Sequence, residues 1–226
     1  MLQAVLVAAI VIFIAEQGDK TQLLAFSLAT RYRAWQVLLG IFFVNAGVLL
    51  IVVLAGRLVG TLVPGPWLVL FSGLGFVVFG TLTLSAADES VNASGGRFQR
   101  FGPVLTTAGL FFLAEIGDQA ELVTAAVAAN PAGPLSALTA LGGGLGAANA
   151  TRLGLVQVHT SPAATLVGVW LGAIIGIMLA DGIGIAAGRV LGHRLPQRLL
   201  RRASGIAFLL LGALVTGVGV WGLLGR

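Results

Sequence analysis

The sequence consists largely of apolar stretches of about twenty residues, separated by short polar or glycine- and proline-containing connections. A helix needs about 20 apolar residues to cross the roughly 30 Å hydrocarbon core of a bilayer. Only 9% of the 226 residues are charged, whereas about 25% are charged in a typical soluble domain. We therefore expect an all-α polytopic membrane protein whose surroundings are a lipid bilayer. The expected spans are, approximately, residues 2–28, 35–59, 67–86, 103–130, 164–187 and 204–224.

These spans fall into two halves, residues 1–87 and 102–226, joined by a hydrophilic linker at 88–101 that we expect to be cytoplasmic. The first span has no preceding basic segment and no small-residue cleavage site, so we interpret it as a span and not as a signal peptide. The second half carries an insertion at about 131–163 that is rich in glycine and poor in helix formers. We expect an extramembrane or re-entrant segment there. If residues 132–162 span the bilayer, the protein has seven transmembrane helices instead of six.

An acidic motif interrupts the first apolar stretch and recurs in the second half. Residues 13–22 read FIAEQGDKTQ, and residues 112–121 read FLAEIGDQAE, 99 positions later. On a continuous helix, Glu16 and Asp19 lie three residues apart and share one face. The sequence thus predicts two acidic clusters at membrane depth, one in each half.

The two halves resemble each other beyond the motif. Glycine, serine, proline and arginine positions within residues 56–80 recur 132 positions later, within residues 188–212. Two successive halves of three spans each begin on opposite sides of the membrane, which predicts an inverted-topology repeat of the kind found in many secondary transporters.

Arginine positions predict the orientation of these spans. Nine arginines follow the first, third and fifth spans or lie in the linker: Arg31, Arg33, Arg97, Arg100, Arg189, Arg194, Arg198, Arg201 and Arg202. Only Arg57, Arg152 and Arg226 fall on the opposite side. Cytoplasmic loops are enriched in Lys and Arg, so we expect both termini to be extracytoplasmic.

Buried acids require compensation, and this requirement indicates what the motifs do. One charged residue at the bilayer centre costs about 2.5 to 3.5 kcal/mol on insertion scales, so four ionised and unpaired acids would cost on the order of 10 kcal/mol. Protons, the lysine of the first motif or a bound cation can compensate them. Carboxylates near amide and hydroxyl oxygens suit Ca²⁺, Mn²⁺ or Mg²⁺, and burial favours protonation of the same groups when the cation leaves. An alternative is that the acids are half-exposed at a helix end or paired internally.

The candidate metal ligands are the acids of both motifs and one amide, namely Glu16, Asp19, Gln22, Glu115, Asp118 and Glu121. The accessory positions are Lys20, Thr21, Gln119 and Asp181.

Other classes of function are disfavoured by what the sequence lacks. There is no cysteine, and the two histidines, His159 and His193, fall in connecting segments. Disulfides and thiolate metal sites are therefore excluded, and the spans offer no nucleophile with a neighbouring base, so we expect no enzyme and no tightly bound cofactor. The net charge of +5 comes from arginines that flank spans, so nucleic acid is not an expected partner. The sequence does not indicate an oligomeric state.

The motif residues resemble a family of cation/proton antiporters marked by two E-x-G-D-[KR]-[TS] motifs, which includes the Golgi manganese and calcium transporter and bacterial manganese exporters. Residues 16–21 match the motif completely, and Glu115–Asp118 match its first four positions. Gln119 and Ala120 replace the basic and hydroxyl residues of the second copy.

The resemblance implies export of Mn²⁺ or Ca²⁺ from the cytoplasm across the cell membrane in exchange for protons, with the paired acids forming the site. The alternatives are another cation exporter or a channel, or a non-transporting membrane scaffold or assembly factor whose acids are structural.

The arginine distribution makes a prediction about topology. Reporter domains fused at either terminus should be extracytoplasmic, because most arginines of the connections face the other side. Reporter activity or protease accessibility in intact cells measures this. A cytoplasmic C-terminus combined with an external N-terminus would show that the insertion crosses the membrane.

Overall fold

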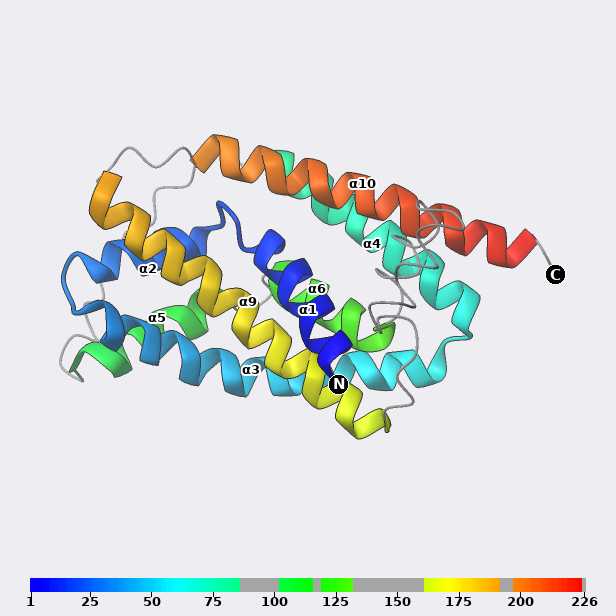
Figure 1. The fold of residues 1–226 in the computed structure, drawn as a ribbon, viewed down its shortest axis with the longest axis horizontal. Coiled ribbons are helices and arrows are strands. Elements are labelled where there is room, and N and C mark those ends of the chain that lie inside the picture. Colours follow the sequence, from blue (N-terminus) through cyan, green and yellow to red (C-terminus); the bar gives the residue numbers. More distant parts are fainter. Residues whose placement is uncertain (86–101, 116–118, 132–160, 192–196, 225–226) are drawn as a thin grey trace.

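The computed structural model describes residues 1–85, 102–115, 119–131, 161–191 and 197–224, and within these ranges the secondary structure is helical, without strands (Figure 1). The helices are α1 (Leu2–Ala15), α2 (Lys20–Ala29), α3 (Ala34–Leu62), α4 (Gly65–Ser85), α5 (Gly102–Glu115), α6 (Gln119–Ala129), α9 (Pro162–Leu191) and α10 (Gln197–Leu224). Within the described residues, α3, α4, α9 and α10 are long and apolar enough to cross a membrane, and α1, α5 and α6 are shorter apolar helices.

Four of the expected spans correspond to the four long helices. The second, third, fifth and sixth expected spans match α3, α4, α9 and α10, although α10 begins about two turns before the expected start. Local signals explain where α9 begins. Ser161 accepts a hydrogen bond from the Ala164 N–H at 3.2 Å, and Pro162 occupies the first helical position, which are the favoured residues at a helix start.

The first expected span is not one helix, so the expectation that Glu16 and Asp19 share a face of a continuous helix is wrong. Helix α1 ends at Ala15, and α2 begins only at Lys20. Between them, Gly18 has a φ of +79°, which residues with a side chain rarely adopt. Asp19 is extended and accepts a hydrogen bond from the Thr21 N–H at 3.4 Å, so it caps α2. The motif therefore lies on a turn between two half-length helices.

The fourth expected span is also represented by two helices. Helix α5 ends at Glu115 and α6 begins at Gln119, and the three residues between them lie outside the described part of the chain. The linker at 88–101, residues 132–160 of the insertion, and both histidines also lie outside the described residues.

The helices form a bundle around α3 and α9, which run in opposite directions (Figure 1). Helix α3 packs against α5 and α6, while α9 packs against α1 and α2. Glycines allow these contacts: Gly56 lies against Ala125 of α6, and Gly172 lies against Val5 and Ala8 of α1. Close approaches of the same kind occur at Gly40, Gly60, Gly168 and Gly176, whereas a Cβ at Gly47 would meet nothing within 4 Å.

Helices α4 and α10 form a separate antiparallel pair beside this bundle (Figure 1). Phe76 and Phe208 stack on each other with ring centroids 6.0 Å apart, and they are 132 positions apart in the sequence. The same spacing relates Gly73 to Gly205 and Gly80 to Gly212. Gly73 packs against Gly212, and Gly80 packs against Gly205. Exchanging the two helices by the 132-position shift therefore turns one glycine contact into the other. This is the pattern of contacts about a two-fold axis.

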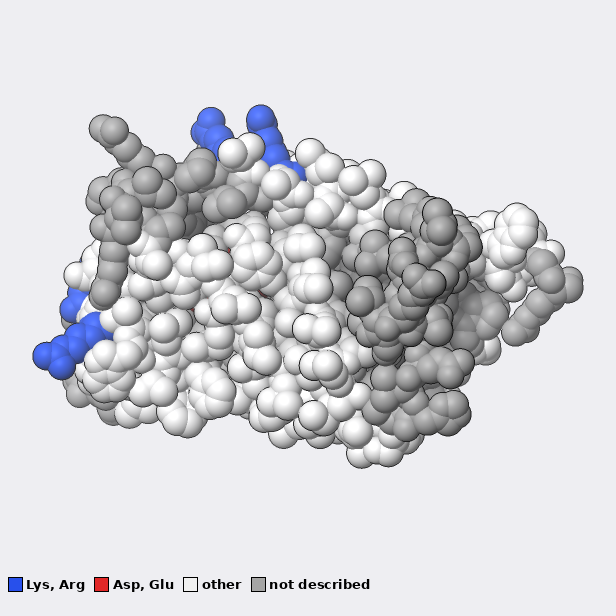
Figure 2. All heavy atoms as spheres, viewed as in Figure 1, with Lys and Arg blue, Asp and Glu red and all other residues white. Residues whose placement is uncertain are grey.

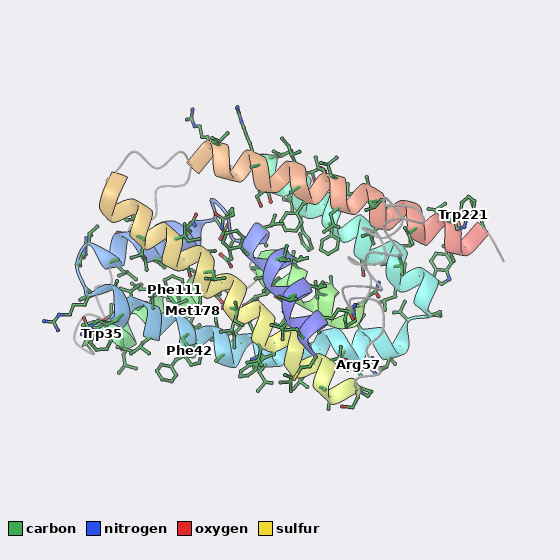
Figure 3. The ribbon with its side chains drawn as sticks, viewed as in Figure 1. Trp35, Phe42, Arg57, Phe111, Met178 and Trp221 are labelled. Carbon is green, nitrogen blue, oxygen red and sulfur yellow. The ribbon has the colours of Figure 1, made fainter. Side chains whose placement is uncertain are left out.

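The surface of the bundle is consistent with a lipid environment. Large apolar side chains such as Phe43, Ile51 and Leu210 are exposed, and the basic side chains visible on the face drawn in Figure 2 lie along the edge where α3 and α10 begin. Trp35 is labelled at that end and Trp221 at the opposite end in Figure 3. Tryptophan is enriched at both membrane interfaces, so we expect the long axis of the molecule to follow the membrane normal.

The close contacts of α3 make a prediction about packing. A Cβ atom at Gly56 would lie 2.3 Å from the Ala125 carbonyl oxygen, whereas nothing lies within 4 Å of a Cβ at Gly47. Gly56→Ala should destabilise the protein by about 1 to 3 kcal/mol because the backbone of α6 must move. Gly47→Ala is the matched control and should be neutral or stabilising by up to about 1 kcal/mol. Thermal unfolding in detergent, followed by circular dichroism, measures both, and equal destabilisation would contradict the packing.

Candidate cation site

The first motif gathers two carboxylates around one hydroxyl. Glu16 is only 1% exposed, and its Oε2 accepts a hydrogen bond from the Thr21 hydroxyl at 2.9 Å. The same hydroxyl lies 3.2 Å from Oδ2 of Asp19. A hydroxyl carries one hydrogen and can donate fully to only one acceptor. The second contact is therefore a good hydrogen bond only when that carboxyl group carries a proton of its own.

The turn between α1 and α2 exposes backbone groups that other residues satisfy. The Ser204 hydroxyl of α10 donates to the Ile14 carbonyl, near the end of α1. The Gly18 N–H donates to Oε1 of Gln22 at 3.0 Å. Unpaired backbone groups are costly at membrane depth, so these side chains make the interrupted helix possible.

Gly18 meets two requirements at this turn. Its φ of +79° favours glycine, and a Cβ at this position would lie 2.8 Å from the backbone nitrogen of Arg201. The start of α10 therefore packs directly on the motif. Any side chain at this position would both strain the turn and displace α10.

Gln22 uses both ends of its amide. Besides accepting from Gly18, it donates from Nε2 to the Ala180 carbonyl of α9 at 3.0 Å. Gly184 gives this side chain its space, because a Cβ there would lie 2.6 Å from Cγ of Gln22. Gln22 therefore connects the motif to α9, next to Asp181. The Asp181 side chain is fully buried, and Asp19 is close enough to repel it electrostatically.

The second motif is described only in part. Glu115 is the last residue of α5 and is 3% exposed. Glu121 is half-buried in the first turn of α6, where a negative charge is favourable to the helix. Asp118 and the side chains of Lys20 and Gln119 lie outside the described part.

The structure brings Glu16, Asp19, Thr21 and Gln22 together at one turn, with Asp181 nearby. Within the described ranges, no three His, Cys, Asp or Glu side chains form a group that could hold a metal ion. Sequence reasoning missed Ser204, which holds the end of α1. Its signal was the recurrence of Ser72–Gly73 as Ser204–Gly205, which was interpreted only as a repeat.

Comparison with known protein families identifies the chain. The model of the divalent cation/proton antiporter GDT1 family matches residues 4–90 and 156–220. The protein belongs to this family. A search of curated proteins and a search of solved structures each found no match.

The family match confirms the expected resemblance and gives the function in outline: the GDT1 family is one of transporters that exchange a divalent cation for protons across a membrane. The matched segments include the complete first motif, the bundle helices α1, α2, α3 and α9, and nearly all of the α4–α10 pair. The second motif lies between the two matched segments, so its assignment rests on its own residues.

The geometry of the first motif makes a prediction about Thr21. Thr21→Val keeps the shape of the side chain but removes the hydroxyl that contacts both Glu16 and Asp19. Groups that orient metal-binding residues typically contribute about 10- to 100-fold to affinity or activity, so cation-driven proton flux in liposomes should fall by about that factor. Thr21→Ser should restore most of it. Equal flux through the Val and Ser variants would show that the hydroxyl has no such role.

Proposed function

We propose that this protein exports Mn²⁺ or Ca²⁺ from the cytoplasm across the cell membrane in exchange for protons. The observation that carries the proposal is the arrangement of the buried Glu16 and Thr21 with the partly buried Asp19 on a turn that interrupts a membrane helix. Non-helical backbone at membrane depth occurs where it is buried in protein or lines a cavity, and discontinuous helices form the ion sites of many transporters.

The donor atoms of the motif favour hard cations. Glu16, Asp19 and Thr21 offer only oxygens, and the sequence contains no cysteine. Ca²⁺ and Mn²⁺ prefer carboxylate, carbonyl and hydroxyl oxygens, whereas thiolates select softer metals. The same oxygens serve Mg²⁺, which releases its waters reluctantly and is therefore the poorer substrate for a site that must bind and release its ion.

Exchange follows from competition for the same oxygens. When the cation is absent, a proton on either Glu16 or Asp19 gives the Thr21 hydroxyl a donor on one side and an acceptor on the other. A divalent cation bound to these oxygens displaces that proton. The site therefore holds either protons or a cation, which is the requirement for antiport.

We propose that the second motif supplies the other arm of the site, with Glu115 and Asp118 as ligands. The reciprocal contacts between α4 and α10 support an inverted repeat, and such repeats bring equivalent discontinuous helices to the midplane. Burial of Glu115 at the end of α5 agrees with this role. Glu121, three residues after Asp118 in the sequence, then acts as a relay for protons from the extracytoplasmic side.

The helix directions support six spans with both termini extracytoplasmic. Helix α6 ends beside Gly60, near the end of α3, and α9 begins at this same end of the bundle (Figure 1). Arg57 is labelled there in Figure 3, whereas α2 ends, and α3 and α10 begin, at the arginine-rich opposite end. The arginine-rich end is the cytoplasmic side in this proposal.

Reconstitution tests the exchange directly. Liposomes that contain the purified protein and an internal pH dye are given Mn²⁺, Ca²⁺ or Mg²⁺ outside, and we expect proton efflux with Mn²⁺ or Ca²⁺. Glu16→Gln and Glu115→Gln should each abolish the efflux while the protein remains folded, because each motif supplies ligands to one site. Glu89→Gln, in the expected linker, removes a carboxylate outside the spans and is the matched control.

The outcomes separate the proposal from its alternatives. Cation flux without proton movement would indicate a channel, and no flux with any of the ions would indicate a scaffold. Exchange at the parent rate in either Glu16→Gln or Glu115→Gln would refute a shared site.

A further inference from the structure

Asp181 is a buried acid for which the described part of the chain supplies no hydrogen-bond partner. Its side chain is 0% exposed, and neither Oδ1 nor Oδ2 accepts a hydrogen bond there. Buried polar groups in folded proteins are nearly always satisfied, and an exception requires an explanation such as an ion. The buried hydroxyls of Thr107 and Thr124, by comparison, donate to carbonyls of their own helices. Asn45 has an unpartnered Oδ1, but its Nδ2 donates to the Ile41 carbonyl.

The position of Asp181 is fixed by the first motif. Gln22 donates to the carbonyl of Ala180, the residue immediately before Asp181, and also accepts from the N–H of Gly18 in the turn. These two hydrogen bonds tie the turn and α9 together through one rigid amide. Glycine at position 184 is needed for this contact, because a Cβ would meet the Gln22 side chain at 2.6 Å.

An acid that acts on Asp181 comes from the opposite half of the chain. Asp19 repels Asp181 electrostatically across the contact between α2 and α9. Two carboxylates that repel each other bind a divalent cation more favourably together than either binds it alone, since the cation removes the repulsion. Ca²⁺ and Mn²⁺ also accept carbonyl and water oxygens as ligands, so a third acid at the same point is not required.

We propose that Asp181 is a ligand of the transported cation, acting with Asp19, and that Gln22 is a positioning residue that holds α9 against the first motif. This inference rests on the proposed exchange of divalent cations. It adds α9 to the two motif arms as a source of ligands. It also gives the amide of Gln22 a role different from the direct coordination that the sequence suggested.

Binding measured on the purified, full-length protein tests the role of Asp181. The dissociation constants of Mn²⁺ and Ca²⁺ are determined in detergent by equilibrium dialysis at one fixed pH. Asp181→Asn keeps the shape of the side chain but removes its charge, and it should weaken binding of the transported ion by at least about tenfold, the lower bound seen for groups that only orient ligands. The melting temperature without metal should stay the same or rise.

Two glycines of α9 provide a matched pair for Gln22. Gly184→Ala displaces the Gln22 side chain, whereas a Cβ at Gly182 meets nothing within 4 Å. Gly184→Ala should weaken metal binding by about 10- to 100-fold and alter the ratio of Mn²⁺ to Ca²⁺ affinity. Gly182→Ala should leave both constants unchanged. A purely structural role for Gln22 would lower the melting temperature of Gly184→Ala without changing the affinity ratio, and would overturn this part of the proposal.

The outcomes distinguish this inference from the function on which it rests. If the parent protein binds and exchanges a divalent cation but Asp181→Asn binds it equally well, Asp181 is not a ligand and the proposed function stands. If the parent neither binds nor exchanges any divalent cation, the proposed function fails and the inference fails with it. Should Asp181→Asn not fold, Asp181→Glu decides the matter, because it moves the carboxylate by one methylene. A changed preference between Mn²⁺ and Ca²⁺ supports the ligand role, and parent-like constants for both ions refute it.

Discussion

A helix that stops inside a bilayer leaves backbone groups that water cannot satisfy. The first motif depends on three side chains that form hydrogen bonds with such groups. Ser204 donates to the Ile14 carbonyl, Gln22 accepts from the Gly18 N–H, and Asp19 accepts from the Thr21 N–H. Because these bonds come from α10 and from α2 itself, the turn can remain open without water. The turn, and not a shared helix face, brings the Glu16 and Asp19 carboxylates to the Thr21 hydroxyl.

The long spans could be predicted from the sequence, because hydrophobic length alone determines whether a helix can cross a bilayer. The interruption at Glu16–Asp19 was not predicted, although two signals were present. Gly18 permits a positive φ, and Asp19 followed by Thr21 is typical of a helix start. The apolar residues on both sides, and the preference of Glu and Gln for helices, favoured one continuous helix. The expectation of one continuous helix thus followed the length of the apolar stretch and not these two local signals.

The composition of the site was predictable only where the interacting residues are near each other in the sequence. Glu16, Asp19 and Thr21 lie within six residues, and their oxygen chemistry could be inferred directly. The partner of Gln22, the Ala180 carbonyl, lies 158 positions away, and no local pattern indicates it. The amide was therefore interpreted as a ligand. The stacking of Phe76 on Phe208 also joins residues far apart in the sequence. In this case the 132-position spacing of the repeat indicated that the two residues are equivalent.

The capping of α2 by Asp19 has a consequence for how the helix responds to its cargo. A cap acts through a carboxylate oxygen and is favoured by negative charge at the helix start, and such a cap contributes about 1 kcal/mol. A proton on Asp19 weakens that cap, and an ion on the same oxygen competes with it. Under the proposed function, the first turn of α2 therefore tightens or loosens according to what the Asp19 carboxylate carries. Gln22 lies in that turn and is hydrogen-bonded to α9, so the same change would reach α9.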